Sequence, residues 1–218
     1  MNDLSIHPVI KILRKEIRKW KVPIVGLVAE ETRDPYQVLI SCLLSLRTKD
    51  SATAAASEKL FKIATRPEEM VRIPASKIEK LIFPVGFYRN KAKTIRGVSR
   101  DLIERFDGRV PDDLDKLLTL KGVGRKTANL VITLGFNKPG ICVDIHVHRI
   151  SNRLGYVRTK NPEESEWALR EKLPRKYWIT YNDLLVTFGQ NLCKPVSPYC
   201  SECAISKYCD RVGVGRSR

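Results

Sequence analysis

The stretch Thr119–Val131, T-L-K-G-V-G-R-K-T-A-N-L-V, joins two predicted helices through a pair of glycines. The first helix should end near Leu120, and the second should begin at Arg125 and stop at Gly135. Glycine supplies the positive backbone angle and the close backbone approach that so tight a turn requires. The pattern therefore predicts a helix-hairpin-helix.

This turn has the features of a phosphate-binding site. The amide N–H groups at the start of the second helix, together with the positive end of its dipole, attract a phosphate oxygen. Two basic side chains add charge around them. An ordinary helix–helix connection would also use the glycines, only to turn the chain. We favour contact with the DNA backbone, which positions a protein without recognising base sequence; the residues expected to make it are Lys121, Gly122, Val123, Gly124 and Arg125.

The charge of the whole chain favours a polyanionic partner. Its 218 residues contain 40 Lys and Arg against 24 Asp and Glu, a net charge of +16. A basic but merely solvated surface would give the same composition, so charge alone does not decide. A membrane is disfavoured because the longest apolar run, Leu39 to Leu46, is too short to span one. The N-terminal M-N-D-L-S-I-H-P lacks the pattern of an export signal. We therefore expect a cytoplasmic, nucleoid-associated monomer.

Four of the six cysteines crowd together near the end of the sequence. Their spacing is C-x6-C-x2-C-x5-C, a single tight loop rather than the two separated C-x2-C pairs usual for zinc. Disulfides would imply an exported chain. We expect a [4Fe-4S] cluster, with zinc as the alternative, on Cys193, Cys200, Cys203 and Cys209. The other two, Cys42 and Cys142, lie in apolar surroundings and should be buried.

Hydrophobic periodicity elsewhere predicts an all-α chain. Apolar residues from Val9 to Trp20 recur every three or four positions, which indicates an amphipathic N-terminal helix. Asp34-Pro35 should open a helix through Leu46 that is apolar on nearly every side and therefore central. Asp50 should cap the next helix, further helices are expected to start at Ser76, Asn90, Asp112 and Pro162, and a last one should run from Tyr181 to Leu192.

The segment Ile141–His148 is ambiguous. Its apolar and polar residues alternate, which is typical of a strand. A single strand would have no partner, however. Asp144 is a good helix N-cap, and Ile150 and Leu154 continue a four-residue spacing, so a helix from Asp144 is favoured.

The hairpin L-K-G-V-G-R-K-T-A, the later V-D-I-H-V-H-R and the cysteine spacing together resemble the endonuclease III family of helix-hairpin-helix DNA glycosylases, from about Asp34 to Asp210. The resemblance implies two lobes. One is a six-helix barrel of residues 24–138 with the hairpin, and the other is a cluster lobe of residues 1–23 and 139–218 with the cysteine loop 193–209. It further implies a base-excision enzyme that acts on double-stranded DNA, removes oxidised pyrimidines and cleaves abasic sites by β-elimination.

The same resemblance assigns the chemistry to two residues. Lys126 matches the family's nucleophile, and Asp144 matches its catalytic aspartate. These residue types suit the reaction, because a carboxylate stabilises a cation-like sugar and an amine forms an imine at C1′. The alternatives are a plain backbone contact for Lys126 and a plain helix cap for Asp144.

Residues that would handle the damaged base follow from the same motifs. Ser45, Asp50 and His146 match lesion-pocket positions. Arg47 stands where the family usually has a gap-filling glutamine, and Phe87 stands where a wedge leucine is usual. A flipped base leaves a gap in the duplex that such side chains must fill.

Two other functions are compatible with parts of the pattern. A monofunctional relative that removes a mispaired base would lack the hairpin lysine. A non-enzymatic, cluster-containing DNA-binding protein would need neither Lys126 nor Asp144.

Overall fold

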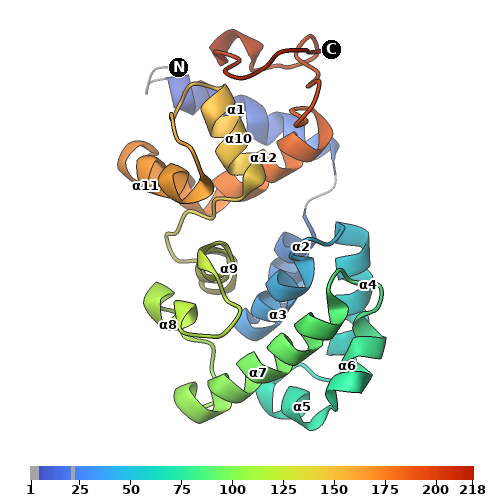
Figure 1. Ribbon diagram of the computed structural model, residues 1–218. Helices are drawn as coiled ribbons and strands as arrows, with labels where there is room; N and C mark the ends of the chain where they lie inside the picture. Colours follow the sequence, from blue (N-terminus) through green and yellow to red (C-terminus); the bar gives the residue numbers. More distant parts are fainter. Residues whose placement is uncertain (1–4, 21–22) are drawn as a thin grey trace. The chain divides into compact units, whose positions relative to one another are not determined.

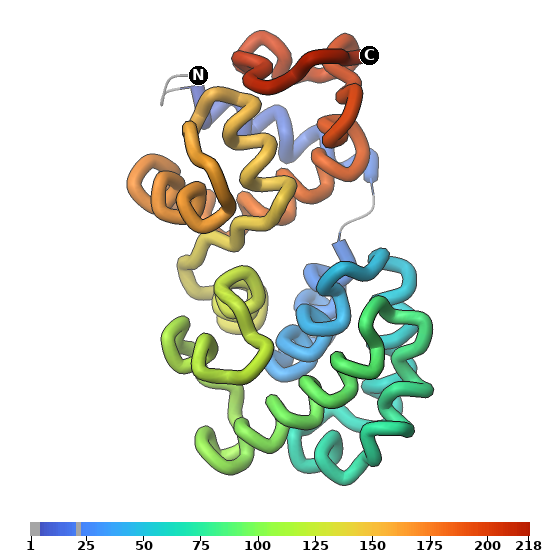
Figure 2. The backbone as a smooth tube through the Cα atoms, viewed as in Figure 1, coloured from blue at the N-terminus to red at the C-terminus, as the bar shows by residue number. Residues whose placement is uncertain are grey.

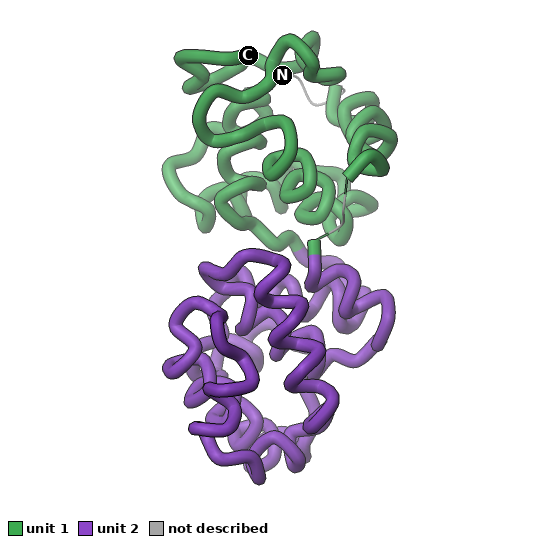
Figure 3. Tube along the Cα trace, turned by 90° about the vertical axis from the view of Figure 1, so that its right-hand side faces the viewer, with its two compact units in different colours: residues 1–23, 141–218 green, residues 24–140 purple. Residues whose placement is uncertain are grey.

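The fold is given by a computed structural model, which describes residues 5–20 and 23–218 (Figure 1). Within these ranges the regular structure is helical and contains no strand, which confirms the all-α prediction. The chain divides into two compact units, residues 24–140 and residues 1–23 with 141–218 (Figure 3). The first four residues of the segment tested for an export signal lie outside the described part.

The unit of residues 24–140 is a set of packed helices that ends with the predicted hairpin. In order they are α2 (Ile24–Thr32), α3 (Pro35–Ser45), α4 (Asp50–Phe61), α5 (Pro67–Arg72), α6 (Ala75–Ile82), α7 (Tyr88–Phe106), α8 (Leu114–Leu118), α9 (Arg125–Leu130) and the π-helical turn η3 (Val131–Gly135).

Helix α3 forms the centre of this unit, as predicted. The Asp34 side chain caps it by accepting a hydrogen bond from the Tyr36 amide at 2.8 Å, and Pro35 supplies the first helical residue. Every residue from Val38 to Leu44 is buried. Helices α2, α4, α7 and α9 all pack on α3, so its lack of a polar face is explained.

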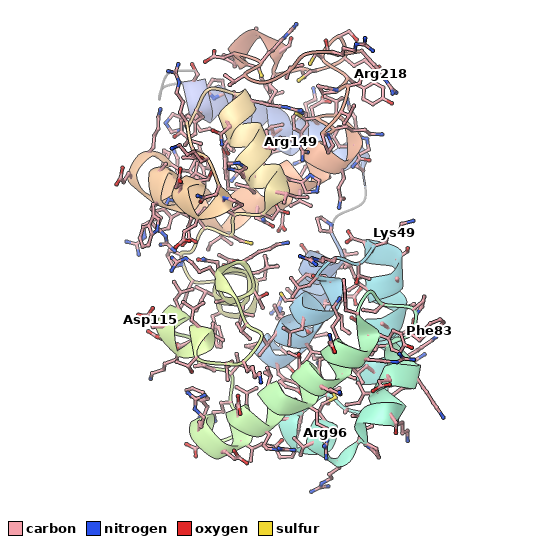
Figure 4. The ribbon with its side chains drawn as sticks, in the orientation of Figure 1. Lys49, Phe83, Arg96, Asp115, Arg149 and Arg218 are labelled. Atoms are coloured by element: carbon pink, nitrogen blue, oxygen red, sulfur yellow. The ribbon has the colours of Figure 1, made fainter. Side chains whose placement is uncertain are left out.

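Five helix starts differ from the prediction. Two of them are α8, which begins at Leu114 and not at Asp112, and α12, which begins at Trp178 and not at Tyr181. Asp50 is the first residue of α4 rather than its cap, and Lys49 at the cap position makes no side-chain capping bond (labelled in Figure 4). Helix α6 begins one residue before Ser76, directly after an extended Pro74. Helix α7 begins two residues before Asn90, because Phe87 takes a left-handed conformation that sets the entry of the chain. Differences of one or two residues are of the size by which helix ends vary, because terminal turns fray.

The second unit packs the N-terminal helix against the last third of the chain. Its elements are α1 (Ile6–Glu16), η2 (Ile17–Lys19), α10 (Ile145–Arg153), α11 (Pro162–Lys172), η4 (Arg175–Tyr177), α12 (Trp178–Asn191) and η5 (Ser206–Tyr208). The buried stripe of α1, which includes Val9 and Leu13, packs in one core with residues of α10 and α12. The amphipathic N-terminal helix is confirmed.

The ambiguous segment is resolved in favour of a helix. Ile141, Cys142 and Val143 are buried but form no strand, and α10 begins directly after Asp144. The Asp144 side chain accepts hydrogen bonds from the His146 and Val147 amides, which fixes the start of the helix. The strand alternative is wrong.

Two further sequence expectations can be compared with the fold. Cys42 and Cys142 are each 1% exposed, as predicted for buried small hydrophobes. Among the described helices, none has both the length and the apolar character needed to cross a membrane.

Candidate active site

The predicted helix-hairpin-helix is formed by α8, a short turn and α9 (Figure 2). Buried Leu120 and Val123 anchor the turn. Its two glycines differ. Gly122 has φ +91°, and a Cβ added there would lie 2.6 Å from Thr94 Cγ2. Gly124 has φ −93°, and a Cβ there would meet nothing within 4 Å. The expectation that both glycines serve a positive φ or a close approach within the chain is therefore wrong for Gly124, since only Gly122 makes the turn.

Lys126 is presented to solvent by a well-anchored helix start. It is the second residue of α9 and is exposed, whereas Thr127 and Ala128 behind it are buried. Lys121, in the turn, is exposed as well, and Arg125 is half-buried. The hairpin thus carries its basic side chains on a backbone that its neighbours hold in place.

Asp144 belongs to the other unit and is 8% exposed. Its Oδ1 accepts from the His146 amide at 2.8 Å and from the Val147 amide at 2.9 Å. The capping interpretation of Asp144 is therefore correct. A carboxylate held by two amide donors has a fixed orientation, which a catalytic role also requires.

His146, next along α10, packs against α12. Its Nδ1 lies 3.1 Å from Arg149 Nη2 (Arg149 is labelled in Figure 4), and a Cβ added at Gly189 would lie only 2.6 Å from that ring nitrogen. Arg149 Nη2 also donates to the Cys193 carbonyl at 2.9 Å. His148 instead hydrogen-bonds Ser165 Oγ at 2.7 Å and so connects α10 to α11.

Arg47 and Phe87, distant in sequence, come together in the unit of residues 24–140. The Arg47 guanidinium carbon lies 5.7 Å from the centroid of the Phe87 ring, and Phe87 is 60% exposed. Nearby in the chain, the Ser45 hydroxyl donates to the Cys42 carbonyl at 2.8 Å, and Asp50 is half-buried in the first turn of α4.

Sequence reasoning missed Lys91, which is 8% exposed on α7. Its ammonium donates hydrogen bonds to the end of α3 and the loop that follows, and burial lowers its pKa to about 8. A signal was present in the sequence. Lys91 stands in register with Ile95, Val98 and Leu102, the buried stripe of α7, where a lysine is out of place.

The four predicted cluster cysteines line one cavity in the second unit. Arg153 Nη1 lies 3.5 Å from Cys193 Sγ, and the same guanidinium donates to the Lys194 and Pro195 carbonyls at 2.6 Å each. Burial, with a smaller contribution from the three neighbouring thiols, raises the pKa of the Cys203 thiol to about 11. In residues 5–20 and 23–218, no three His, Cys, Asp or Glu side chains converge closely enough to hold a single metal ion.

Comparisons with known proteins agree with these features. The family model for the HhH-GPD superfamily base excision DNA repair protein matches residues 40–175. The chain is 49% identical over 188 residues to endonuclease III of Thermotoga maritima, a match that covers 85% of this chain and 88% of that relative. The chain belongs to the endonuclease III family. As a member of that family it is a base-excision DNA glycosylase with an associated abasic-site lyase activity.

Solved structures support the same assignment. A structure of a trapped endonuclease III–DNA covalent intermediate superposes with a TM-score of 0.86 at 32% identity and covers 97% of each chain. A thermostable thymine-DNA glycosylase matches less well, with a TM-score of 0.75, 27% identity and coverage of 91% of this chain and 97% of the other. Membership of the endonuclease III family excludes the monofunctional and non-enzymatic alternatives.

Proposed function

We propose that the chain removes oxidised pyrimidines from double-stranded DNA and then cleaves the strand at the abasic site through a Schiff base on Lys126. The observation that carries this proposal is the exposed Lys126 in the first turn of α9, directly behind the glycine turn of the hairpin. A lysine so close to a turn that binds the DNA backbone can approach the sugar of the nucleotide that the hairpin positions.

The proposed reaction uses the two candidate residues in sequence. As the C1′–N bond breaks, the base leaves with the bonding electrons, and the Asp144 carboxylate stabilises the positive charge that develops on the sugar. The Lys126 amine bonds to C1′, and the C1′–O4′ bond of the sugar ring then breaks as one proton passes from the nitrogen to the ring oxygen, which leaves a protonated imine. The imine acidifies the C2′ hydrogen, whose loss expels the 3′ phosphate. Hydrolysis of the remaining imine releases the lysine.

A trapping experiment tests this function. The wild-type protein is incubated with a duplex that contains thymine glycol, in the presence of borohydride, which reduces an imine to a stable amine. We expect base release together with a covalent protein–DNA adduct. Base release without an adduct would mean that no Schiff base forms. If neither base release nor an adduct is observed, oxidised pyrimidines are not the substrate class of this protein.

DNA would be held by Lys121, Gly122, Val123, Gly124 and Arg125 of the hairpin turn. Exposed basic side chains and the net charge of +16 support contact with phosphates. The open space around Gly124 supports the same role, because a phosphate oxygen can approach a backbone that has no side chain in its way.

The two turn glycines should therefore respond differently to alanine. Gly122→Ala forces a strained φ and a contact with Thr94, so stability should fall by about 1–3 kcal/mol. Gly124→Ala should cost at most about 1 kcal/mol of stability, yet should weaken binding to a duplex with an uncleavable abasic analogue about tenfold or more. Thermal denaturation and a binding titration measure the two effects. Unchanged binding by Gly124→Ala would contradict a phosphate contact at this turn.

We assign the handling of the flipped base to residues of both units. Arg47 and Phe87 would fill the gap in the duplex, since an exposed guanidinium stacked on an exposed ring can both wedge and hydrogen-bond. Ser45, Asp50 and His146 would line the lesion pocket. We also propose that the chain forms two lobes. The hairpin would belong to a barrel lobe of residues 24–138, and the cysteines would belong to a cluster lobe of residues 1–23 and 139–218.

We further propose that Cys193, Cys200, Cys203 and Cys209 hold a [4Fe-4S] cluster. The four thiols line one cavity, and their C-x6-C-x2-C-x5-C spacing forms a single tight loop, whereas zinc sites usually have two separated C-x2-C pairs. The Arg153 guanidinium lies near Cys193 Sγ, and its positive charge would stabilise a negatively charged cysteine thiolate that binds the cluster. When bound, the cluster would cross-link the C-terminal loop and so supply folding free energy.

Loss of one of these thiols should remove the iron. Cys203→Ser is expected to give a colourless protein with little iron and a stability lower by more than about 2 kcal/mol. Cys142→Ala is the control, because it removes a buried thiol outside the loop and should leave the iron content unchanged. Iron analysis and visible absorbance measure the result. Zinc in a colourless wild-type protein would contradict the assignment.

For its working state, we propose a monomer that acts on DNA in the cytoplasm. Its size and charge support this proposal, and sedimentation with and without duplex DNA tests it.

A further inference from the structure

We propose that Lys91 is a positioning residue that locks Arg47 and Phe87 into one preformed wedge for the DNA duplex. The proposal rests on the gap-filling role proposed above for those two residues. All of the groups involved lie in the unit of residues 24–140.

The Lys91 ammonium forms hydrogen bonds with residues before and after Arg47 in the chain. Its Nζ donates to the Leu44 carbonyl at 2.7 Å, the Leu46 carbonyl at 2.5 Å and Thr48 Oγ1 at 2.9 Å. The two carbonyls belong to the end of α3, where the helix leaves acceptors without intrahelical donors. A cation at this end also interacts favourably with the helix dipole. One buried ammonium thus fixes the segment that presents Arg47.

Thr48 links this hydrogen-bonded segment to the turn before α7. Its Oγ1 accepts from the Gly86 amide at 3.2 Å in addition to Lys91, and it donates to the Leu46 carbonyl. The two backbones are in direct contact here, because a Cβ added at Gly86 would lie 2.7 Å from the Arg47 carbonyl oxygen. The segment that presents Arg47 and the turn that presents Phe87 therefore form one rigid assembly.

Both wedge residues have a left-handed backbone conformation, which surrounding contacts must stabilise. Arg47 has φ 52° and Phe87 has φ 57°, left-handed values that residues with side chains rarely adopt. Conformations of this kind persist where the surrounding structure over-determines them, and they are frequent at ligand-contacting sites. Here they direct an exposed guanidinium over an exposed ring. A single cation–π contact at the surface is too weak to hold both residues in place.

Rigidity matters for the proposed use. A wedge must replace a base in the stack while that base is held outside the duplex. Side chains that are already ordered lose less conformational entropy on binding, so more of the contact energy remains to offset unstacking. We therefore infer that Lys91 supports base extrusion without touching DNA itself.

Lys91→Met removes the ammonium and retains most of the side-chain volume, and Lys93→Met is a matched control at an exposed lysine of the same helix. The probe is a duplex with 2-aminopurine opposite an uncleavable abasic analogue, whose fluorescence rises when stacking is disrupted. At saturating protein, Lys91→Met should reduce this rise about threefold or more, and Lys93→Met should not. Strand cleavage at an abasic site in single-stranded DNA, which needs no wedge, should stay within about twofold of wild type.

A full fluorescence rise with Lys91→Met would overturn the proposal, and so would an equal loss of cleavage on single-stranded DNA, which would indicate general damage to the fold. The double variant Arg47→Ala/Phe87→Ala separates this proposal from the one on which it rests. If the double variant keeps the full rise, the gap-filling role itself fails. If it loses the rise while Lys91→Met keeps it, only the positioning role fails. Should Lys91→Met not fold, Thr48→Val leaves the ammonium and cuts the link to Gly86, and it must lower the rise in the same selective way.

Discussion

Replacing Lys126 by alanine is expected to abolish strand cleavage and borohydride trapping on a duplex with an abasic site. Without the amine no imine forms at C1′, the C2′ hydrogen is not acidified, and the 3′ phosphate has no route to leave by β-elimination. The rate of cleavage should fall about 1,000-fold or more. Adduct formation on a denaturing gel and the rate of strand cleavage measure the effect. Binding to an uncleavable abasic analogue should weaken only a few-fold, because Lys126 is one of several basic side chains of the hairpin turn and its loss removes a single charge.

Lys121→Ala is the matched control, since Lys121 is an exposed lysine in the same hairpin. It removes the same charge and should lower the affinity for damaged and undamaged duplexes alike, with a salt dependence reduced by about one unit. At saturating protein it should still form the adduct. An adduct that persists in Lys126→Ala, or one that is lost equally in Lys121→Ala, would show that Lys126 contributes charge and not a nucleophile.

The hairpin shows both the strength and the limit of sequence reasoning. The turn and the start of α9 at Arg125 could be predicted, because glycine and the apolar spacing act locally along the chain, whereas α8 is shorter at both ends than the predicted helix. The different roles of Gly122 and Gly124 could not be. Their spacing is identical in any turn of this type, and only the contact with Thr94, a residue of α7, shows which glycine is required by the fold.

One side chain determined which secondary structure was predicted for the segment before α10. Alternation of polar and apolar residues from Ile141 to His148 fits a strand as well as a helix start. The capping chemistry of Asp144 correctly favoured the helix, because a carboxylate that can accept from two amides stabilises a helix start wherever the chain permits it.

Contacts between distant segments account for what the sequence did not disclose. The spacing of the four cysteines is visible in the sequence, whereas the Arg153 guanidinium that holds the Cys193–Pro195 segment comes from a helix far earlier in the chain. In the same way, Lys91 meets residues 44–48 only after α7 has packed on α3. A pattern along the chain can mark such a residue as unusual, as a lysine in an apolar stripe, but it cannot name its partners.

Asp144→Asn is expected to lower the rate of base excision about 100-fold or more, while binding to an abasic analogue stays within a few-fold of wild type. The physical reason is that a neutral amide does not stabilise the positive charge that develops on the sugar. The fold should tolerate the change. Both capping bonds of Asp144 end on the same oxygen, Oδ1, and the carbonyl oxygen of asparagine can accept the same two amides. Stability should therefore stay within about 0.5 kcal/mol of wild type.

Asp144→Ala separates the two roles of this side chain. It removes the cap as well as the charge, so it should lose the same activity and, in addition, about 1 kcal/mol of stability. Single-turnover excision of thymine glycol and thermal denaturation, measured on both variants, give the comparison. If Asp144 were only a helix cap, Asp144→Asn would excise the base at nearly the wild-type rate, and only Asp144→Ala would be impaired. Equal activity loss in the two variants, with unequal stability, is the result that assigns the catalytic contribution to the ionised carboxylate and not to the helix cap, because both substitutions remove the carboxylate and only Asp144→Ala removes the cap.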